Sequence, residues 1–333
     1  EHELLASLPN TNLVVIIATS IVLLLAVFRS FRLAHRYSGP VESLTLQGNR
    51  MQRLNFEPGE SVTSDITEIR HLSATLERMR AALQSFTSAR EDLRAARAIR
   101  ESTLPATIPS PPGCDIDIWQ EPSEELGGEC FDALVAAVRG DQGPGAVVIA
   151  LFDFAATGLA ASVGGGQLSA EFRVAAAVCD ADLGKIAARL QRFVRLERPE
   201  LSPLRTCLLK LDDQQELRML RFGWDGVLHF RGDCADRPGS MAPPLGLDSR
   251  FEDGEPVAIA LEAGDSVVIA SDGVLDAIGS DRKRYRLEGL EKSVLASGTG
   301  SIVDAVVADL HDYSVGVRGD RTILVIRAQD QAV

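Results

Sequence analysis

An uncharged apolar segment near the N-terminus, Leu13 to Phe28, constrains the fold of this chain more than any other feature. Polar and aromatic neighbours extend it to the roughly 17–25 residues that a helix needs to cross a bilayer. Acidic residues precede it and basic residues follow it at once (Glu1 and Glu3; Arg29, Arg32, His35 and Arg36). Because basic flanks stay in the cytoplasm, we expect a single-pass helix across the inner membrane over residues 13–31, with the remaining chain on the cytoplasmic side.

Two other structures give a similar pattern, a buried core helix and the apolar part of a signal peptide. No small-residue cleavage site follows the segment, and a long stretch of cytoplasmic character does, which favours a membrane helix surrounded by lipid. Residues 1–12 are then an extracytoplasmic remnant. Because the chain begins at Glu1 rather than Met, we expect a sensor module to precede it.

A helical region with a polar interruption follows the membrane segment. Gly39-Pro40 predicts a stop or kink in a helix, residues 55–64 form a polar connector, and Ser64-Asp65 has side chains that begin helices. Apolar residues then recur every three or four positions, at Ile66, Ile69, Leu72, Leu76, Met79, Leu83 and Phe86. This seam predicts a helix that packs against a second copy of the chain. One amphipathic helix lying on its own domain would give the same pattern.

The order of these segments resembles a HAMP linker. The resemblance rests on the membrane helix, the basic juncture, Gly39-Pro40, the connector, and the pattern from Asp65 to Met79, and it covers roughly residues 30–87. It implies a HAMP linker over residues 32–87 that forms a parallel homodimer and relays a signal across the membrane. Residues 88–104, rich in arginine and alanine, continue as a signalling coiled coil up to Pro105.

After Pro105 the sequence changes to short apolar runs bounded by Gly, Asp or Pro, which are typical of strands. Predicted strands are Ile116–Trp119, Ala133–Val138, Ala146–Phe152, Thr206–Leu211, Glu216–Phe222, Val257–Leu261, Ser266–Ala270 and Thr322–Arg327. Predicted helices are Gly165–Ala181, Leu183–Leu196 and Ser301–Val315. This order predicts an α+β fold, an α-β-β-α sandwich with two antiparallel sheets flanked by helices, in a domain of residues 105–333.

Composition excludes two classes of function. The 333 residues carry a formal net charge of −13 with a pI of about 4.9, whereas a nucleic-acid-binding protein usually carries a basic stripe. The five cysteines show no C-x-x-C spacing and are odd in number. A disulfide framework or a zinc site is therefore not expected, and reduced thiols in a cytosolic compartment fit better.

Acidic residues stand at the ends of several predicted strands, namely Glu129, Asp132, Asp153, Asp272 and Asp320. Carboxylates at the ends of separate strands can converge on one point. Hard cations such as Mg²⁺ and Mn²⁺ need oxygen ligands of this kind. An aspartate before a glycine is also a common turn former, so the pattern by itself leaves both roles open.

The segment from Ala95 to Arg327 resembles the SpoIIE/RsbU branch of the metal-dependent serine/threonine phosphatases, the protein phosphatase 2C (PP2C) superfamily. Several motifs stand in the order of that family. They are Leu104-Pro105; Gly127–Asp132 in place of G-G-D-F-Y-D; Asp153–Gly158 in place of D-V-S-G-H-G; Pro244–Leu247, Gly264-Asp265 and Ser271–Gly273, which match P-L-G-L, G-D and T-D-G; and Gly319–Thr322 in place of D-D-x-T.

The resemblance implies a site for two Mn²⁺ or Mg²⁺ ions. Asp153 would bridge the ions with help from the Phe154 carbonyl, Asp272 would bind one ion, and Glu129 and Asp320 would complete the set. A metal-bound water would attack phosphoserine or phosphothreonine on a partner protein. In relatives that partner is often a small STAS-domain antagonist in a sigma-factor partner switch. Asp132 would either support the site from behind or face solvent.

Three positions depart from the family pattern. Glu129 replaces an aspartate, the loop after Asp153 has become Phe154-Ala155-Ala156, and Gly319 stands where the first aspartate of D-D-x-T is the metal ligand. Asp320 is retained next door, but neighbouring strand residues face opposite sides, so it can serve only if the loop is reshaped. We expect a membrane-anchored signalling phosphatase that hydrolyses phosphoserine or phosphothreonine on its partner. The alternatives are a pseudophosphatase that acts as a signal-dependent binding module, and a one-metal enzyme that needs the dimer.

Overall fold

The computed structural model of the chain describes residues 8–59, 62–103, 105, 107–122, 127–136, 146–154, 158–247, 255–298, 300–317 and 319–329. The chain divides into two compact units, residues 1–91 and 92–333. The predictions on residues 1–7, on Leu104, and on residues 60–61, 137–138, 155–157 and 330–333 lie outside the described residues.

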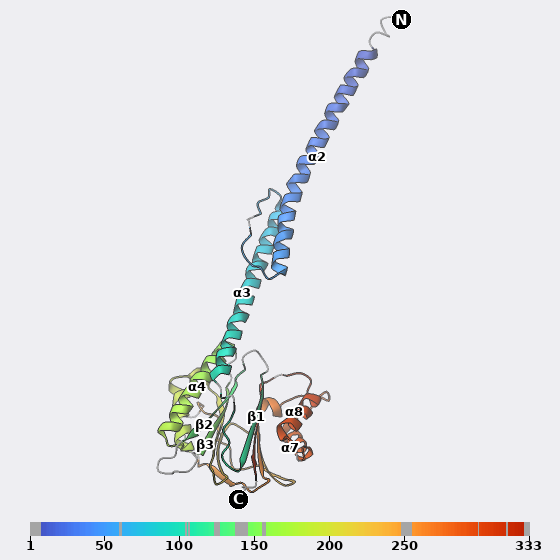
Figure 1. The fold of residues 1–333 in the computed structure, drawn as a ribbon. Coiled ribbons are helices and arrows are strands. Elements are labelled where there is room, and N and C mark those ends of the chain that lie inside the picture. The colour runs from blue at the N-terminus through green and yellow to red at the C-terminus, as the bar shows by residue number, and fades with distance from the viewer. Residues whose placement is uncertain are drawn as a thin grey trace. The chain divides into compact units, whose positions relative to one another are not determined.

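The first unit contains helix α2, Leu8–Gln52, and the first part of helix α3, Thr67–Thr103 (Figure 1). From Val14 onward α2 is long and apolar enough to cross a membrane, by length and composition. Its side chains from Val14 to Phe28 are exposed. A helix that leaves an uninterrupted apolar surface uncovered in water is typical of a segment whose natural solvent is lipid.

Helix α2 does not stop at Gly39-Pro40, contrary to one alternative of the prediction; it passes through both residues. Proline normally disturbs a helix because it lacks the N–H donor and because its ring clashes with the Cβ of the preceding residue. Gly39 has no Cβ, so the second of these effects does not arise. The helix therefore continues with the loss of one backbone hydrogen bond.

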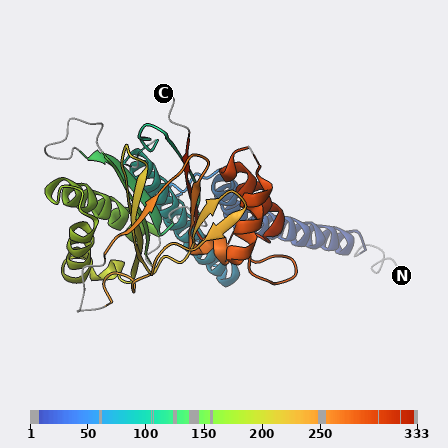
Figure 2. The same ribbon diagram turned by 90° about the horizontal axis from the view of Figure 1, so that it is seen from below.

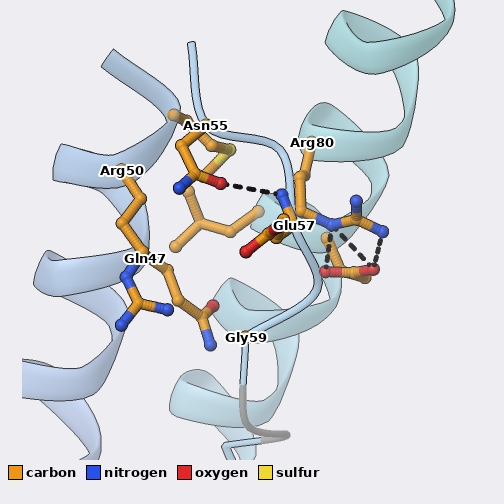
Figure 3. Close-up of a pocket in the computed structure, with 9 residues that line it drawn as sticks. Gln47, Arg50, Asn55, Glu57, Gly59 and Arg80 are labelled. Atoms are coloured by element: carbon orange, nitrogen blue, oxygen red, sulfur yellow. Dashed lines mark hydrogen bonds and ion pairs between the residues drawn. The ribbon is translucent and has the colours of Figure 1, made fainter. Parts of the chain in front are cut away.

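The connector between the two helices is held by Arg80 of α3. Its guanidinium donates to the Phe56 carbonyl over 2.6 Å and pairs with Glu77. Figure 3 shows the small pocket beside this contact, lined by Gln47, Arg50, Asn55, Glu57, Gly59 and Arg80 among others. Of the predicted seam, Ile69 is buried within this unit and Leu76 is half-buried beside the pocket, whereas Leu72, Met79, Leu83 and Phe86 are exposed.

The second unit is built on two five-stranded antiparallel sheets within the described residues. The first has the order β1 (Cys114–Glu121), β10 (Arg321–Ala328), β9 (Ser266–Ala270), β6 (Val227–Arg231) and β7 (Cys234–Asp236). The second has the order β2 (Glu129–Ala136), β3 (Ala146–Phe154), β4 (Leu204–Leu211), β5 (Glu216–Phe222) and β8 (Val257–Ala260).

Helices cover the outer face of each sheet (Figures 1 and 2). Helices α4 (Gly158–Val178) and α5 (Leu183–Leu196), followed by the short 3₁₀ helix η1 (Pro199–Leu201), pack on the second sheet. Helices α7 (Arg286–Ala296) and α8 (Ile302–Tyr313) pack on the first, and the short α6 (Asp272–Leu275) follows β9. A third apolar core fills the space between the sheets. This arrangement confirms the predicted α-β-β-α sandwich.

Strand β3 shows why the sequence builds these layers. Val147, Ile149 and Leu151 lie in the core between the sheets, and the alternate residues from Val148 to Phe152 lie under the helices. A strand buried on both faces reads as a continuous apolar run, because each side chain in turn meets one core or the other. The run ends at Asp153, which is only partly buried. The first charged side chain of β3 therefore stands at the edge of the sandwich.

The observed elements extend or add to the predicted ones at identifiable places. Strand β2 begins at Glu129, four residues before the predicted start. The sequence pattern does not reveal these first residues as a strand, because Glu129 and Asp132 are polar side chains that are buried against distant partners. Strands β6 and β7 and helix α7 were not predicted. Helix α7 contains Gly289, which lowers helix propensity by about 1 kcal/mol relative to alanine.

Candidate functional site

Four acidic residues from separate strand ends meet at one edge of the sandwich. Glu129 lies directly opposite Asp153 in the β2–β3 pair of the second sheet. Asp320, just before β10 of the first sheet, accepts a hydrogen bond at Oδ2 from the Glu129 N–H over 3.1 Å. Asp272, which follows β9, is joined to Asp153 through a shared partner, Arg205. The predicted convergence of these carboxylates is therefore present in the fold.

Glu129 is buried, with 6% of its surface exposed. Its Oε2 accepts a hydrogen bond from the Thr322 hydroxyl over 2.6 Å. Burial raises the pKa of Glu129 well above its ordinary value, and the charges of Asp153 and Asp320 add to this, whereas hydrogen bonds from Thr322 and Ser271 oppose it. Glutamate in place of aspartate thus reaches from β2 of one sheet to β10 of the other.

Arg205 is the shared partner of the two aspartates. It is the residue opposite Asp153 in the β3–β4 pair. Its Nη1 atom lies 2.8 Å from Asp153 Oδ2 and 2.7 Å from Asp272 Oδ2. Burial raises the pKa of both aspartates, and the Arg205 charge partly offsets this. Burial would lower the pKa of Arg205, but its carboxylate partners outweigh burial and raise it.

Asp132 lies away from this cluster. It is fully buried and its carboxylate makes two hydrogen bonds with Arg173 of α4, over 2.7 and 2.9 Å. Side chains three residues apart on a strand point to opposite faces, so Asp132 faces the helical layer while Glu129 faces the other sheet. The solvent-facing alternative for Asp132 is wrong, because its side chain is buried. The ion pair with the Arg173 guanidinium offsets the cost of burying this charge.

Gly127 and Gly273 leave room for the loop before β10, which passes close to both of them. A Cβ on Gly127 would lie 2.0 Å from Asp320 Oδ2, and a Cβ on Gly273 would lie 1.8 Å from the Asp320 carbonyl oxygen. Both distances are far below contact, so no other residue fits without movement. At Gly319 the situation differs, since the nearest atom to a Cβ there is Gly273 Cα at 3.4 Å. The backbone at position 319 has room for a side chain that the sequence does not supply.

These placements test whether the donor set fits a metal centre. In the part of the chain that the structure describes, no group of three His, Cys, Asp or Glu side chains is placed to hold one metal ion. Glu129 is bonded to Thr322, Asp320 to a backbone N–H, and Asp153 and Asp272 to Arg205. The side chains in this arrangement do not fit a two-metal site. The ligand roles implied for Glu129, Asp153, Phe154, Asp272 and Asp320 stay predictions.

A cavity of about 550 Å³ opens beside the acidic cluster. Arg205 and Asp272 line it together with Arg237, Arg284 and Arg286. Arg237 pairs with Asp225 at 3.2 Å and Arg284 with Asp276 at 2.8 Å, in ion pairs that are about half exposed. Exposed ion pairs are weak and exchange readily. Four acidic residues line the cavity as well, Asp225, Asp272, Asp276 and Glu288. An incoming anion would therefore have to displace carboxylates in order to bind the guanidinium groups.

Sequence reasoning missed Arg205 and Thr322. Arg205 lies one residue before the predicted strand Thr206–Leu211, where a charged residue gives no signal of its own. Its role depends on pairing opposite Asp153, which is 52 residues away in the chain. Only the register between β3 and β4 reveals it.

The family of the chain follows from its sequence as well as from this geometry. Residues 143–329, more than half of the chain, match the family model of Stage II sporulation protein E (SpoIIE). This chain belongs to the SpoIIE family. Its second unit is therefore a SpoIIE-family phosphatase domain of the PP2C type, which confirms the predicted resemblance. None of the curated proteins matches the chain.

Solved structures share the fold of the SpoIIE-family domain. The SiaA-PP2C domain of Pseudomonas aeruginosa has a TM-score of 0.61 and 18% identity, covering 73% of this chain and 98% of that one. The RsbU and RsbW domains of Rv1364c from Mycobacterium tuberculosis have a TM-score of 0.56 and 20% identity, covering 69% of this chain and 64% of that one. The PP2C domain of SpoIIE from Bacillus subtilis, with a fragment of its regulatory domain, has a TM-score of 0.54 and 16% identity, covering 65% and 64%.

Proposed function

We propose that this protein is a membrane-anchored signalling protein whose SpoIIE-family domain recognises a phosphorylated partner protein and acts as a binding module without two-metal hydrolysis. The position of Asp320 carries this proposal. Its carboxylate lies against Gly127 and accepts a hydrogen bond from the Glu129 N–H, so it fixes the first residue of β2 in place. The neighbouring position, where the family motif has a ligand, is Gly319.

The membrane route of the signal is part of the proposal. The uncovered apolar surface of α2 supports a span over residues 13–31 of the inner membrane, with the phosphatase-type domain, residues 105–333, in the cytoplasm. The exposed seam of α3 supports a homodimer through a HAMP linker, residues 32–87, and a coiled coil, residues 88–104. Leu72 and Met79 in this seam are about half exposed, at 50% and 51%, which leaves an apolar stripe that a second copy would cover.

The cavity beside the site supports the proposed class of partner. Arginine guanidinium groups bind phosphate oxygens in a bidentate manner, and Arg237, Arg284 and Arg286 line this cavity. A phosphoserine or phosphothreonine on a small regulatory protein, such as a STAS-domain antagonist, suits these groups. Such a partner would be bound and released according to the state of the membrane-spanning part.

The test uses the full chain in lipid nanodiscs, with the Asp153→Asn variant as control. Hydrolysis of a phosphoserine-bearing protein and of an aryl phosphate is measured with and without Mn²⁺. We expect rates that do not differ between the wild-type chain and the control. Mn²⁺-dependent turnover that is abolished by Asp153→Asn would refute the binding-module function.

The second candidate function is a metal-dependent serine/threonine phosphatase that uses two Mn²⁺ or Mg²⁺ ions. One observation favours it: the pKa values of Glu129, Asp153 and Asp272 are all raised, by burial first and also by neighbouring carboxylates. Crowded carboxylates of this kind are stabilised by a cation. The hydrolysis measurement decides between the two functions, and activity that appears only in the dimer would instead support the one-metal enzyme.

A further inference from the structure

We infer that Arg205 is a tethered cation that occupies the place between Asp153 and Asp272 and thereby excludes divalent metal ions from it. The inference rests on the proposed function and deepens it, because it names the side chain that prevents metal ions from binding at this site of the SpoIIE-family domain. It concerns a residue that no sequence motif of the chain includes.

The contacts of Arg205 are those of a bridging cation. A single nitrogen, Nη1, contacts one carboxylate oxygen of Asp153 and one of Asp272, over 2.8 and 2.7 Å. Two carboxylates held this close repel each other unless a positive charge lies between them. A divalent ion at the same place would use the same oxygen atoms, so the guanidinium and the ion cannot both bind there.

The fold holds Arg205 in this position from two directions. The β3–β4 register places its backbone opposite Asp153. Gly223 makes room for its aliphatic stem: a Cβ there would lie 3.2 Å from Arg205 Cγ and 2.5 Å from Pro244 Cγ. Gly223 also has a φ of +66°, which other residues rarely adopt. The stem is therefore confined between β4 and the Gly223 turn, and the guanidinium is directed to the two aspartates.

Charge counting points the same way. Glu129, Asp153, Asp272 and Asp320 bring up to four negative charges, and Arg205 supplies a positive charge in direct contact with two of them. Loss of the guanidinium would leave Asp153 and Asp272 facing each other with their oxygens unpaired in these contacts. The most effective replacement available in solution is a divalent cation, because it carries two charges and prefers oxygen ligands. Removal of Arg205 should therefore create metal affinity.

The test is a Mn²⁺ titration of the full chain in lipid nanodiscs. Binding is measured by calorimetry and, independently, by the electron paramagnetic resonance signal of free Mn²⁺. The variants are Arg205→Ala and Arg205→Gln. Arg218→Ala is the matched control, since it removes the same charge from β5, where Arg218 pairs with Glu216 over 2.6 Å. Arg205→Ala combined with Asp153→Asn shows whether any gained site uses Asp153.

We expect Arg205→Ala and Arg205→Gln to bind Mn²⁺ at least about tenfold more tightly than the wild-type chain, because an adjacent like charge is removed. Arg218→Ala should leave binding unchanged, and the double variant should lose the gain. Wild-type binding as tight as that of both Arg205 variants would overturn the inference. If Arg205→Ala does not fold, the comparison of Arg205→Gln with the wild-type chain decides in the same way.

The outcome is separable from that of the proposed function. Mn²⁺-dependent hydrolysis by the wild-type chain that Asp153→Asn abolishes would refute both the binding module and the tethered cation, because the ion would then bind where Arg205 is inferred to exclude it. Conversely, an inactive wild-type chain whose Arg205 variants gain no Mn²⁺ affinity would leave the binding module standing and refute the role of Arg205.

Discussion

Glu129 and Thr322 are hydrogen-bonded across the two sheets of the SpoIIE-family domain, with the Thr322 hydroxyl donating to Glu129 Oε2 over 2.6 Å. The two residues are 193 positions apart in the chain. Thr322 is itself anchored, because its N–H donates to the Ser271 hydroxyl over 3.0 Å. A carboxyl group at the strand edge is thus built into the junction of β2, β9 and β10, and its protonation is coupled to the stability of that junction.

The domain should lose stability as the pH rises through the range in which Glu129 ionises. The pKa of Glu129 is raised in the folded state, so the folded state holds this proton more tightly than the unfolded state does. Stability from this group is fully present below the unfolded pKa and is lost as the pH rises through the folded pKa. Asp153 and Asp272 have raised pKa values and act in the same direction.

Unfolding by urea between pH 4 and pH 8 measures this, with Glu129→Gln as the comparison. The glutamine carbonyl can still accept the Thr322 hydrogen bond and does not ionise. We expect the variant to have a weaker dependence of unfolding free energy on pH than the wild-type chain. Parallel curves for the two proteins would show that Glu129 is not the group that titrates.

Gly319→Asp should increase affinity for Mn²⁺. The backbone at position 319 has room for a Cβ, 3.4 Å from Gly273 Cα, and Gly273 adjoins Asp272. An added carboxylate there supplies an oxygen ligand beside an existing one, which we expect to tighten Mn²⁺ binding by about tenfold. Calorimetric titration checks this, and the gain should be larger when Arg205→Ala is also present. Identical affinity of Gly319→Asp and the wild-type chain would contradict the placement of position 319 beside the site.

Gly127→Ala should destabilise the domain. The new methyl group would fall 2.0 Å from Asp320 Oδ2, so the carboxylate must move and release the Glu129 N–H. Overpacking of this kind costs about 1–3 kcal/mol, measured as the change in the free energy of unfolding in urea. Gly166→Ala is the control: apart from its chain neighbours and the backbone of α4, no atom lies within 4 Å of its Cβ position, and alanine favours the helix by about 1 kcal/mol. Equal effects of the two substitutions would argue against the Asp320 contact.

Leu76→Asp should disrupt the homodimer. Leu76 belongs to the apolar seam of α3. A buried charge without a partner destabilises an interface by about 3–5 kcal/mol. Light scattering of the detergent-solubilised chain should show the monomer mass for this variant. Ser85→Asp, off the seam on the same helix, should keep the dimer mass. A dimer that survives Leu76→Asp would contradict pairing through the seam.

Much of the sandwich can be predicted from local pattern. The helix Leu183–Leu196 was predicted with its observed bounds because its apolar residues follow one face, and Asp182 caps its first turn through the Lys185 N–H. Strand β3 was evident as a continuous apolar run. Strand β2 was recognised only in its apolar half, since buried Glu129 and Asp132 look like surface residues until Thr322 and Arg173 are known.

The candidate site was predicted in outline and not in its connections. The position of Glu129, Asp153, Asp272 and Asp320 at strand ends predicted that their side chains would lie close together. What they bind depends on strand register and on contacts between the sheets, which a local pattern does not encode. Arg205 is the clearest case, because its partner at position 153 is fixed by hydrogen-bond register and its other partner, Asp272, begins the short helix after β9 of the opposite sheet.

A cation carried on strand β4 has a consequence for the surroundings in which the protein works. An ion from solution occupies a site according to its supply, whereas a side chain fixed beside its partners has a constant effective concentration. The charge of Asp153 and Asp272 is then balanced equally in manganese starvation and in manganese excess. A chelating agent would leave this balance unchanged, because the guanidinium is covalently part of the chain.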